Sequence, residues 1–188
     1  MTWVNTSPLV KTYTLEEFWE LPEPPDHSKI ELIAGVLYMT PPPETPHNEA
    51  ASRLNLLLSQ HLIEMGNGKL YFPRTGISIT PNTWLEPDLF YISAETRASI
   101  TGRYLTTADL VIEIISPGSA IYDRNTKADT YAVLGIKELW LVDEFEGLVE
   151  VRVLKGDSYE SHVFEREDDL ISTVLPGFSF KVGEIFGD

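Results

Sequence analysis

The chain has 188 residues, of which 43% are hydrophobic, so it is long enough to bury one sizeable apolar core. It contains no cysteine, which excludes disulfides, thiolate metal sites and cysteine nucleophiles and favours a reducing, cytoplasmic location. The net charge of −15 argues against a general nucleic-acid binder, although residues 97–137 are close to neutral. We expect no membrane association, because no apolar run could span a bilayer and residues 1–15 lack a secretory signal pattern.

The first half of the chain carries helical and strand patterns in alternation. Thr14 and Glu17 have the spacing of a capping box, which predicts a short helix that begins at Leu15. A second helix is predicted from Thr45, since Pro46 suits a first turn and apolar residues then recur at helical spacing up to Gly66. The elements expected here are helices over 15–21 and 45–65, strands over 29–33 and 36–39 joined by a tight turn, and strands over 69–72, 76–79 and 87–93.

The second half predicts a buried strand, a helix and another buried strand, followed by antiparallel hairpins. The elements expected here are strands over 110–116, 138–142, 148–154, 158–164 and 171–174, a loop over 117–122, and a helix over 124–134 capped by Asp123. A right-handed crossover would make strands 110–116 and 138–142 parallel neighbours. The fold class predicted is α/β (α+β mixed): one domain over residues 1–188, with a mixed central sheet flanked by helices and closed by C-terminal hairpins.

Three acidic residues stand inside otherwise apolar strands: Glu31, Asp88 and Glu113. A buried carboxylate is costly unless it is paired, protonated or bound to a cation. Three of them in one pocket would repel one another unless a divalent cation compensated, and an oxygen-only donor set favours Mg²⁺ or Mn²⁺ over zinc. The alternative is that each acid is satisfied separately, by an arginine or a backbone amide.

Lys127 lies in the first turns of the helix that follows the Glu113 strand. The return of the chain would bring this lysine over the carboxyl end of that strand, where an ammonium could orient water or neutralise charge on a phosphorus centre. The alternative is an ordinary solvated lysine on a helix surface.

Taken together, these motifs resemble the PD-(D/E)XK nuclease superfamily, and the chain as a whole resembles the Uma-two family of small bacterial proteins described as restriction endonucleases. The stretches that carry the resemblance are IELIAGVL (30–37), PH (46–47), EPDL (86–89), VIEIISP (111–117), DRNTK (123–127) and YAVLGIKELWLVD (131–143).

The resemblance implies a restriction-endonuclease-like fold and a metal-dependent phosphodiesterase site. Asp88 and Glu113 would ligate the metal, Glu31 would be the additional acidic residue, and Lys127 the catalytic lysine. The superfamily pattern places its lysine two residues after the acid, where this chain has Ile115. The lysine would therefore come from the helix, while the Ile115 carbonyl could still ligate the metal.

Three further side chains are candidate substrate contacts. His47, at the head of the second helix, could contact a phosphate or assist proton transfer, or it could be a surface or capping residue. Arg124 could contact the substrate or be solvated or structural. Tyr131 could orient Lys127, or it could be a packing residue, and residues 116–119 could offer backbone amides to a phosphate or form a simple turn.

Three functions remain open from the sequence. The leading hypothesis is a Mg²⁺- or Mn²⁺-dependent nuclease that hydrolyses phosphodiester bonds of DNA and acts as a homodimer. The second is an inactive nuclease-like scaffold that serves as an acidic protein-interaction module, since Ile115 replaces the usual lysine and residues 138–188 are strongly acidic. The third is glycoside hydrolysis by paired carboxylates, which only the acidic residues support.

Overall fold

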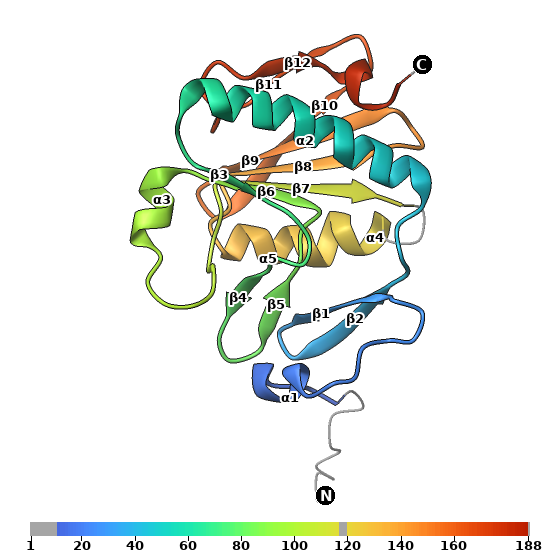
Figure 1. Ribbon diagram of the computed structural model, residues 1–188, viewed down its shortest axis with the longest axis vertical. Helices are drawn as coiled ribbons and strands as arrows, with labels where there is room; N and C mark the ends of the chain where they lie inside the picture. Colours follow the sequence, from blue (N-terminus) through green and yellow to red (C-terminus); the bar gives the residue numbers. More distant parts are fainter. Residues whose placement is uncertain (1–10, 117–119, 188) are drawn as a thin grey trace, which may run out of the picture. The chain divides into compact units, whose positions relative to one another are not determined.

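The structure is a computed structural model that describes residues 11–116 and 120–187 (Figure 1). Its internal contacts divide the chain into two compact units. The smaller unit contains Met1–Pro42 and Ser78–Leu85, and the larger unit contains Pro43–Ile77 and Glu86–Asp188. The expectation of one domain over residues 1–188 stays a prediction. In the described ranges no helix combines the length and apolar character that crossing a membrane requires.

The smaller unit is a helix and a sheet of strand order β2-β1-β5-β4. Its elements are α1 (Leu15–Trp19), β1 (Lys29–Ile33), β2 (Val36–Thr40), β4 (Ile77–Ile79) and β5 (Thr83–Leu85). The capping box of Thr14 and Glu17 is confirmed, although α1 ends two residues earlier than expected. The β1–β2 hairpin is also confirmed, with Ala34 and Gly35 at φ 49° and 83° in its two-residue turn.

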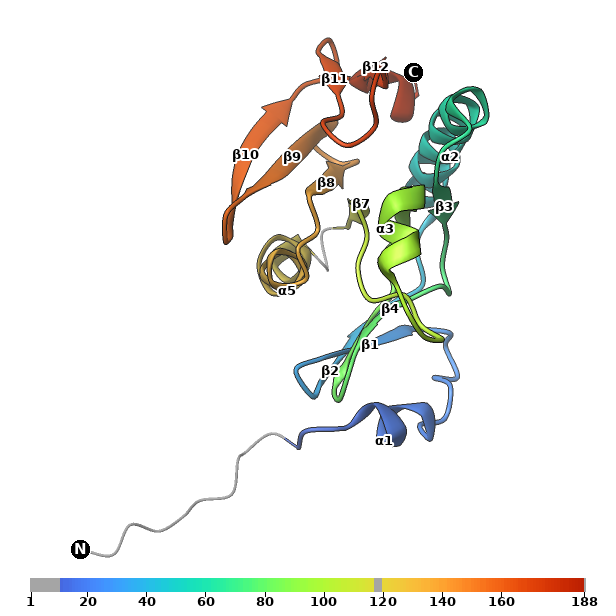
Figure 2. The same cartoon turned by 90° about the vertical axis from the view of Figure 1, so that its left-hand side faces the viewer.

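The larger unit is built on a six-stranded sheet of order β10-β9-β8-β7-β6-β3. Its strands are β3 (Lys69–Tyr71), β6 (Leu89–Ile92), β7 (Leu110–Ile115), β8 (Glu138–Asp143), β9 (Leu148–Lys155) and β10 (Ser158–Phe164). The long helix α2 (Thr45–Met65) lies on one face of this sheet, and α5 (Ala128–Val133) lies on the other (Figure 2). The larger unit therefore has the helix-flanked mixed sheet that the sequence predicts.

The parallel pair at the centre of this sheet is confirmed. β7 and β8 run parallel, with Glu113 opposite Leu141, and every other strand pair of the sheet for which a register is defined is antiparallel. Because side chains alternate along a strand, Leu110, Ile112 and Ile114 join the core beneath α2. Glu113 consequently faces α5.

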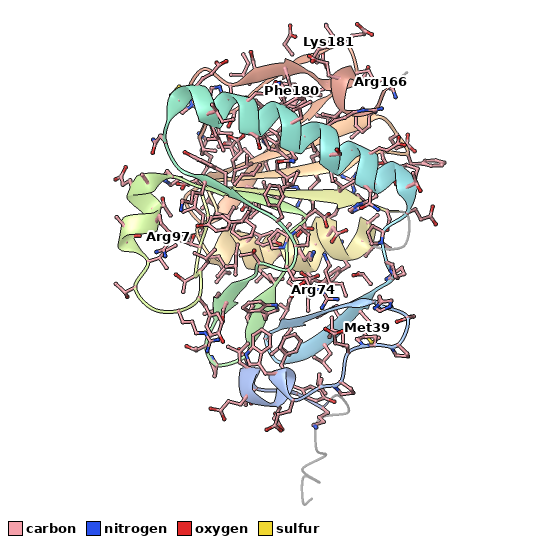
Figure 3. All side chains as sticks on the ribbon, viewed as in Figure 1. Met39, Arg74, Arg97, Arg166, Phe180 and Lys181 are labelled. Atoms are coloured by element: carbon pink, nitrogen blue, oxygen red, sulfur yellow. The ribbon has the colours of Figure 1, made fainter. Side chains whose placement is uncertain are left out.

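The C-terminal segment completes the core on the α2 face. Phe180, labelled in Figure 3, has its ring centroid 5.8 Å from that of Trp140, and Phe178 lies 6.2 Å from the same tryptophan. The segment forms β11 (Asp169–Ile171), β12 (Ser179–Lys181) and a 3₁₀-helix (Val182–Ile185). The strand predicted over 171–174 is therefore wrong: the pairing involves 169–171 and a strand that the sequence analysis did not propose.

The helical segment after β7 differs from its prediction. It starts with α4 (Ala120–Tyr122), continues through a π-helical turn (Asp123–Lys127) and ends with α5. Asp123 is thus inside the helix, so its assignment as N-cap is wrong, and the end of the predicted loop over 117–122 is helical. Residues 117–119 lie outside the described residues, and with them most of the stretch considered for phosphate binding. A further helix, α3 (Ala94–Ser99), and strand β5 were not expected.

Candidate functional site

Asp88 and Glu113 come from neighbouring antiparallel strands of the larger unit. Asp88 immediately precedes β6, and the register pairs its neighbour Leu89 with Ile112, the residue before Glu113. The Asp88 carboxylate accepts a hydrogen bond from the backbone N–H of Ile114 at 2.9 Å. Pro87, which has no N–H to donate, directly precedes Asp88 where the β6 ladder ends.

Glu113 is buried in a network of side chains from the helical segment after β7. Its Oε1 atom accepts hydrogen bonds from Lys127 Nζ at 2.9 Å and from the Tyr131 hydroxyl at 2.5 Å. Lys127 Nζ also lies 3.5 Å from Oδ1 of Asp123. The Lys127 side chain is only 2% exposed, so the alternative of a solvated surface lysine is wrong.

The π-helical turn explains how Lys127 reaches the strand. Asp123 and Lys127 begin and end this turn, and both are buried. The Lys127 ammonium also lies 5.5 Å from the centroid of the Tyr122 ring. Single π-helical turns within α-helices occur frequently at functional sites, because they reorient side chains that a regular helix would turn away. Here the turn places Asp123 and Glu113 beside the same Lys127 ammonium.

His47 lies in the first turn of α2 and contacts Asp88. Its Nε2 atom is 3.2 Å from Oδ2 of Asp88, the oxygen that also accepts the Ile114 N–H. Close to this histidine, burial raises the pKa of Glu144, an effect that Glu44 reinforces and His47 opposes. The His47 side chain is 13% exposed, so it is a largely buried partner of the Asp88 carboxylate rather than a residue facing only solvent.

Arg124 is held by carboxylates of two strands. It forms ion pairs with Asp143 of β8, at 3.0 Å, and with Glu150 of β9. Arg152 contacts the same Glu150 at 2.7 Å and donates to the backbone carbonyl of Arg124 at 2.7 Å. These contacts fix the helical segment to the sheet. A contact between Arg124 and a substrate stays a prediction.

Ile115 and Glu31, two residues that the family resemblance implies, are not among the side chains described so far. Ile115, at the end of β7, is 2% exposed and its side chain carries no charge, so the ammonium beside Glu113 is that of Lys127. Glu31 belongs to the smaller unit, where it is 1% exposed and 4.0 Å from Lys29 Nζ. Its convergence with Asp88 and Glu113 stays a prediction.

Asp123 is the residue of this network that sequence reasoning missed. An acid directly after a predicted loop is typical of an N-cap, and that interpretation concealed its spacing of four residues from Lys127, which suits an ion pair within a helix. Within residues 11–116 and 120–187, no group of three His, Asp or Glu side chains is arranged to hold a metal ion. Asp88 and Glu113 offer a set of two carboxylates.

Comparisons with known proteins agree with this architecture. The Uma2 family, described as "Putative restriction endonuclease", matches residues 15–183. The fold is similar to the crystal structure of "a putative nuclease belonging to DUF820" from Anabaena variabilis, with a TM-score of 0.76 and 20% identity, covering 93% of this chain and 97% of that chain. This likeness confirms the mixed α/β fold class. The comparison with curated proteins found no match. Because the family model spans nearly all of the sequence, the chain belongs to the Uma2 family, the Uma-two family that its motifs resemble.

Proposed function

We propose that this protein is a divalent-metal-dependent nuclease that hydrolyses phosphodiester bonds of DNA. The observation that carries the proposal is the buried contact of 2.9 Å between Lys127 Nζ and Glu113 Oε1, on the strand next to Asp88. An acid on each of two adjacent strands and an ammonium beside them are the groups that the superfamily resemblance implies. Membership of a family described as restriction endonucleases supports the same reaction class.

The donor set fits a hard divalent cation. Asp88 and Glu113 would supply carboxylate oxygens, and the Ile115 carbonyl is the third donor in the proposal. No thiolate ligand is possible in a chain without cysteine, so we propose Mg²⁺ or Mn²⁺. When bound, such an ion would supply Lewis-acid activation of the phosphoryl oxygen and of water. Glu31 is proposed as the additional acidic residue.

The remaining side chains orient these carboxylates and offset their negative charge. Lys127 offsets the charge of Glu113 and, with a phosphate present, its ammonium would neutralise negative charge that develops at phosphorus. Tyr131 fixes the rotamer of Glu113 through its hydroxyl, and His47 restrains Asp88. We propose that His47, Arg124 and Tyr131 also line the path of the substrate, and that a homodimer supplies enough locally neutral surface for DNA despite the net charge of −15.

A supercoiled-plasmid nicking assay with Mg²⁺, Mn²⁺ or EDTA tests the proposal. The wild type should nick the plasmid in Mg²⁺ or Mn²⁺ and not in EDTA, while Glu113→Gln should lose at least about 100-fold in rate because it removes a ligand charge. Glu146→Gln, in the exposed turn after β8, is the matched control and should retain full activity. A wild type inactive with both metals, or a Glu113→Gln variant as active as wild type, would overturn the nuclease.

An inactive scaffold is the second candidate, and one observation favours it. Oε1 of Glu113 already accepts hydrogen bonds from Lys127 and Tyr131. Calorimetric titration with Mn²⁺ separates the two candidates. Binding in the wild type that is lost in a folded Asp88→Ala variant supports the nuclease. Absence of binding in both proteins supports the scaffold.

A further inference from the structure

Strand β10 forms one edge of the six-stranded sheet in the larger unit. It pairs with β9 over seven consecutive residues without a bulge, from Ser158 opposite Lys155 to Phe164 opposite Val149. Figure 2 shows it as the outermost strand, and the sheet order ends there among the described residues. Five of its seven residues are exposed, including Val163 at 59%.

The direction of the backbone groups along β10 follows from its neighbours. The Leu154 N–H donates to the Lys137 carbonyl at 2.9 Å, so the backbone of Leu154 points toward β8 and away from β10. Tyr159 stands opposite Leu154 and is therefore in a non-hydrogen-bonded pair. By alternation, Tyr159, Ser161 and Val163 direct their N–H and C=O groups away from the sheet, which gives six backbone groups on one line.

This edge lacks most of the features with which proteins normally prevent pairing between edge strands. Edge strands of natural proteins are often short, contain a β-bulge, or carry proline or lysine. β10 is seven residues long and regular, and its sequence SYESHVF contains neither proline nor lysine. An exposed strand of this kind favours addition of another strand.

We propose that β10 pairs antiparallel with β10 of a second copy of this chain, about a two-fold axis at Ser161. Ser161 would then face Ser161 of the other copy, and Tyr159 of each copy would face Val163 of the other. All six outward backbone groups of each strand would be satisfied. The symmetry closes after two copies, so the result is a discrete dimer with one continuous sheet rather than a filament.

The side chains of β10 are complementary in this register. Glu160 of each copy faces His162 of the other in a non-hydrogen-bonded pair, where side chains approach most closely. Tyr159 and Val163 form an aromatic–β-branched pair, a favourable cross-strand combination. An axis at Glu160 would instead place two glutamates opposite each other, and an axis at His162 two histidines. The axis at Ser161 is therefore the one that uses the whole strand and opposes no like residues except the two serines.

This inference gives an interface to the homodimer of the proposed function, but it uses no residue of the candidate site, so dimerisation and nicking activity can fail separately. Sedimentation velocity and amide hydrogen exchange on the full chain test it directly. The wild type should sediment as a dimer, and the amides of Tyr159, Ser161 and Val163 should become protected as protein concentration rises. The amides of Glu160 and His162, which face β9, should be protected at every concentration.

Three variants locate the interface. Ser161→Pro removes an outward N–H, a position at which an edge strand tolerates proline, and should give a folded monomer. Glu160→Lys should weaken the dimer roughly tenfold, because it sets a cation opposite His162 in both pairs. The double variant Glu160→Lys/His162→Glu should restore wild-type affinity, which separates charge complementarity from a general effect on folding.

Three results would overturn the proposal. The first is a wild type that remains monomeric up to a concentration at which the candidate interface should be saturated. The second is a Ser161→Pro variant that keeps the wild-type dimer. The third is a dimer in which the amides of Tyr159, Ser161 and Val163 exchange at the same rate at all protein concentrations.

Discussion

Lys127 places its ammonium 2.9 Å from Oε1 of Glu113, and both side chains are 2% exposed. Desolvation of two charges is expensive, and the attraction between them compensates only while both are present. Removal of one partner leaves the other charge buried, whereas replacement of both removes both charges of this pair. The loss of stability therefore depends on whether a substitution removes one partner of the pair or both.

Substitution of Lys127 by methionine should lower the free energy of unfolding by about 3–5 kcal/mol, because it strands the Glu113 carboxylate in the interior. Glu113→Gln combined with Lys127→Met should cost less than Lys127→Met alone, since one buried carboxylate, that of Asp123, then loses the ammonium instead of two. Urea unfolding followed by circular dichroism measures both variants. A double variant less stable than Lys127→Met would show that the pair itself contributes the stability.

The Tyr131 hydroxyl donates to the same carboxylate oxygen as Lys127. Tyr131→Phe should therefore destabilise the protein by about 1.5–3 kcal/mol, the range for hydrogen bonds to charged groups. Tyr71→Phe is the matched control: this ring stacks on Phe90 at 5.0 Å, and no described residue hydrogen-bonds its hydroxyl. Equal losses of unfolding free energy in the two variants would contradict a specific role for the Tyr131 bond.

The central strands and α2 could be predicted because their own sequences determine them. The nearly continuous apolar runs around Glu113 and Leu139 indicate strands buried on both faces, and the crossover rule makes them parallel. The α2 sequence has proline in its first turn, apolar residues at helical spacing and Gly66, at φ 64°, as its C-cap. The same topology predicts that Lys127 lies close to Glu113.

The elements that were missed depend on contacts distant in sequence. β5, β11 and β12 are each three residues long, too short for an alternating pattern to distinguish them from loops. Asp123 has the sequence context of an N-cap, but it is buried in the helix interior beside Lys127. The place of Glu31 relative to Asp88 depends on the arrangement of the two units, which no local pattern encodes.

Asp109 should make stability depend on pH in the acid range. Burial raises the pKa of its carboxyl, but hydrogen bonds from Lys137, Ser93 and Thr96 outweigh that effect and hold the pKa below its ordinary value of 3.8. The stabilisation is fully present above the unfolded-state pKa and is lost as pH falls through the lowered folded-state value. Asp109→Asn should therefore cost about 1–3 kcal/mol at pH 7, and this difference from wild type should shrink below pH ~3.8.

Urea unfolding at pH 7, 5 and 3 measures this dependence. Asp157→Asn, in the exposed turn between β9 and β10, is the control and should change the free energy of unfolding by less than about 0.5 kcal/mol at each pH. A deficit of Asp109→Asn that grows between pH 5 and pH 3 would have the wrong sign and would exclude a stabilising ionised carboxylate at Asp109.

Gly66 and Gly68 both have positive φ, at 64° and 83°, yet their surroundings predict different costs for a methyl group. A Cβ at Gly66 would meet nothing within 4 Å, so Gly66→Ala should cost about 1 kcal/mol from the backbone alone. A Cβ at Gly68 would lie 2.6 Å from the Ile92 carbonyl oxygen and would overlap the Tyr91 ring. Because both residues belong to β6, this strand would have to move to accommodate the methyl group. Gly68→Ala should therefore destabilise by at least about 2–3 kcal/mol more in urea unfolding. Equal unfolding midpoints for the two variants would contradict the tight packing of Gly68 against β6.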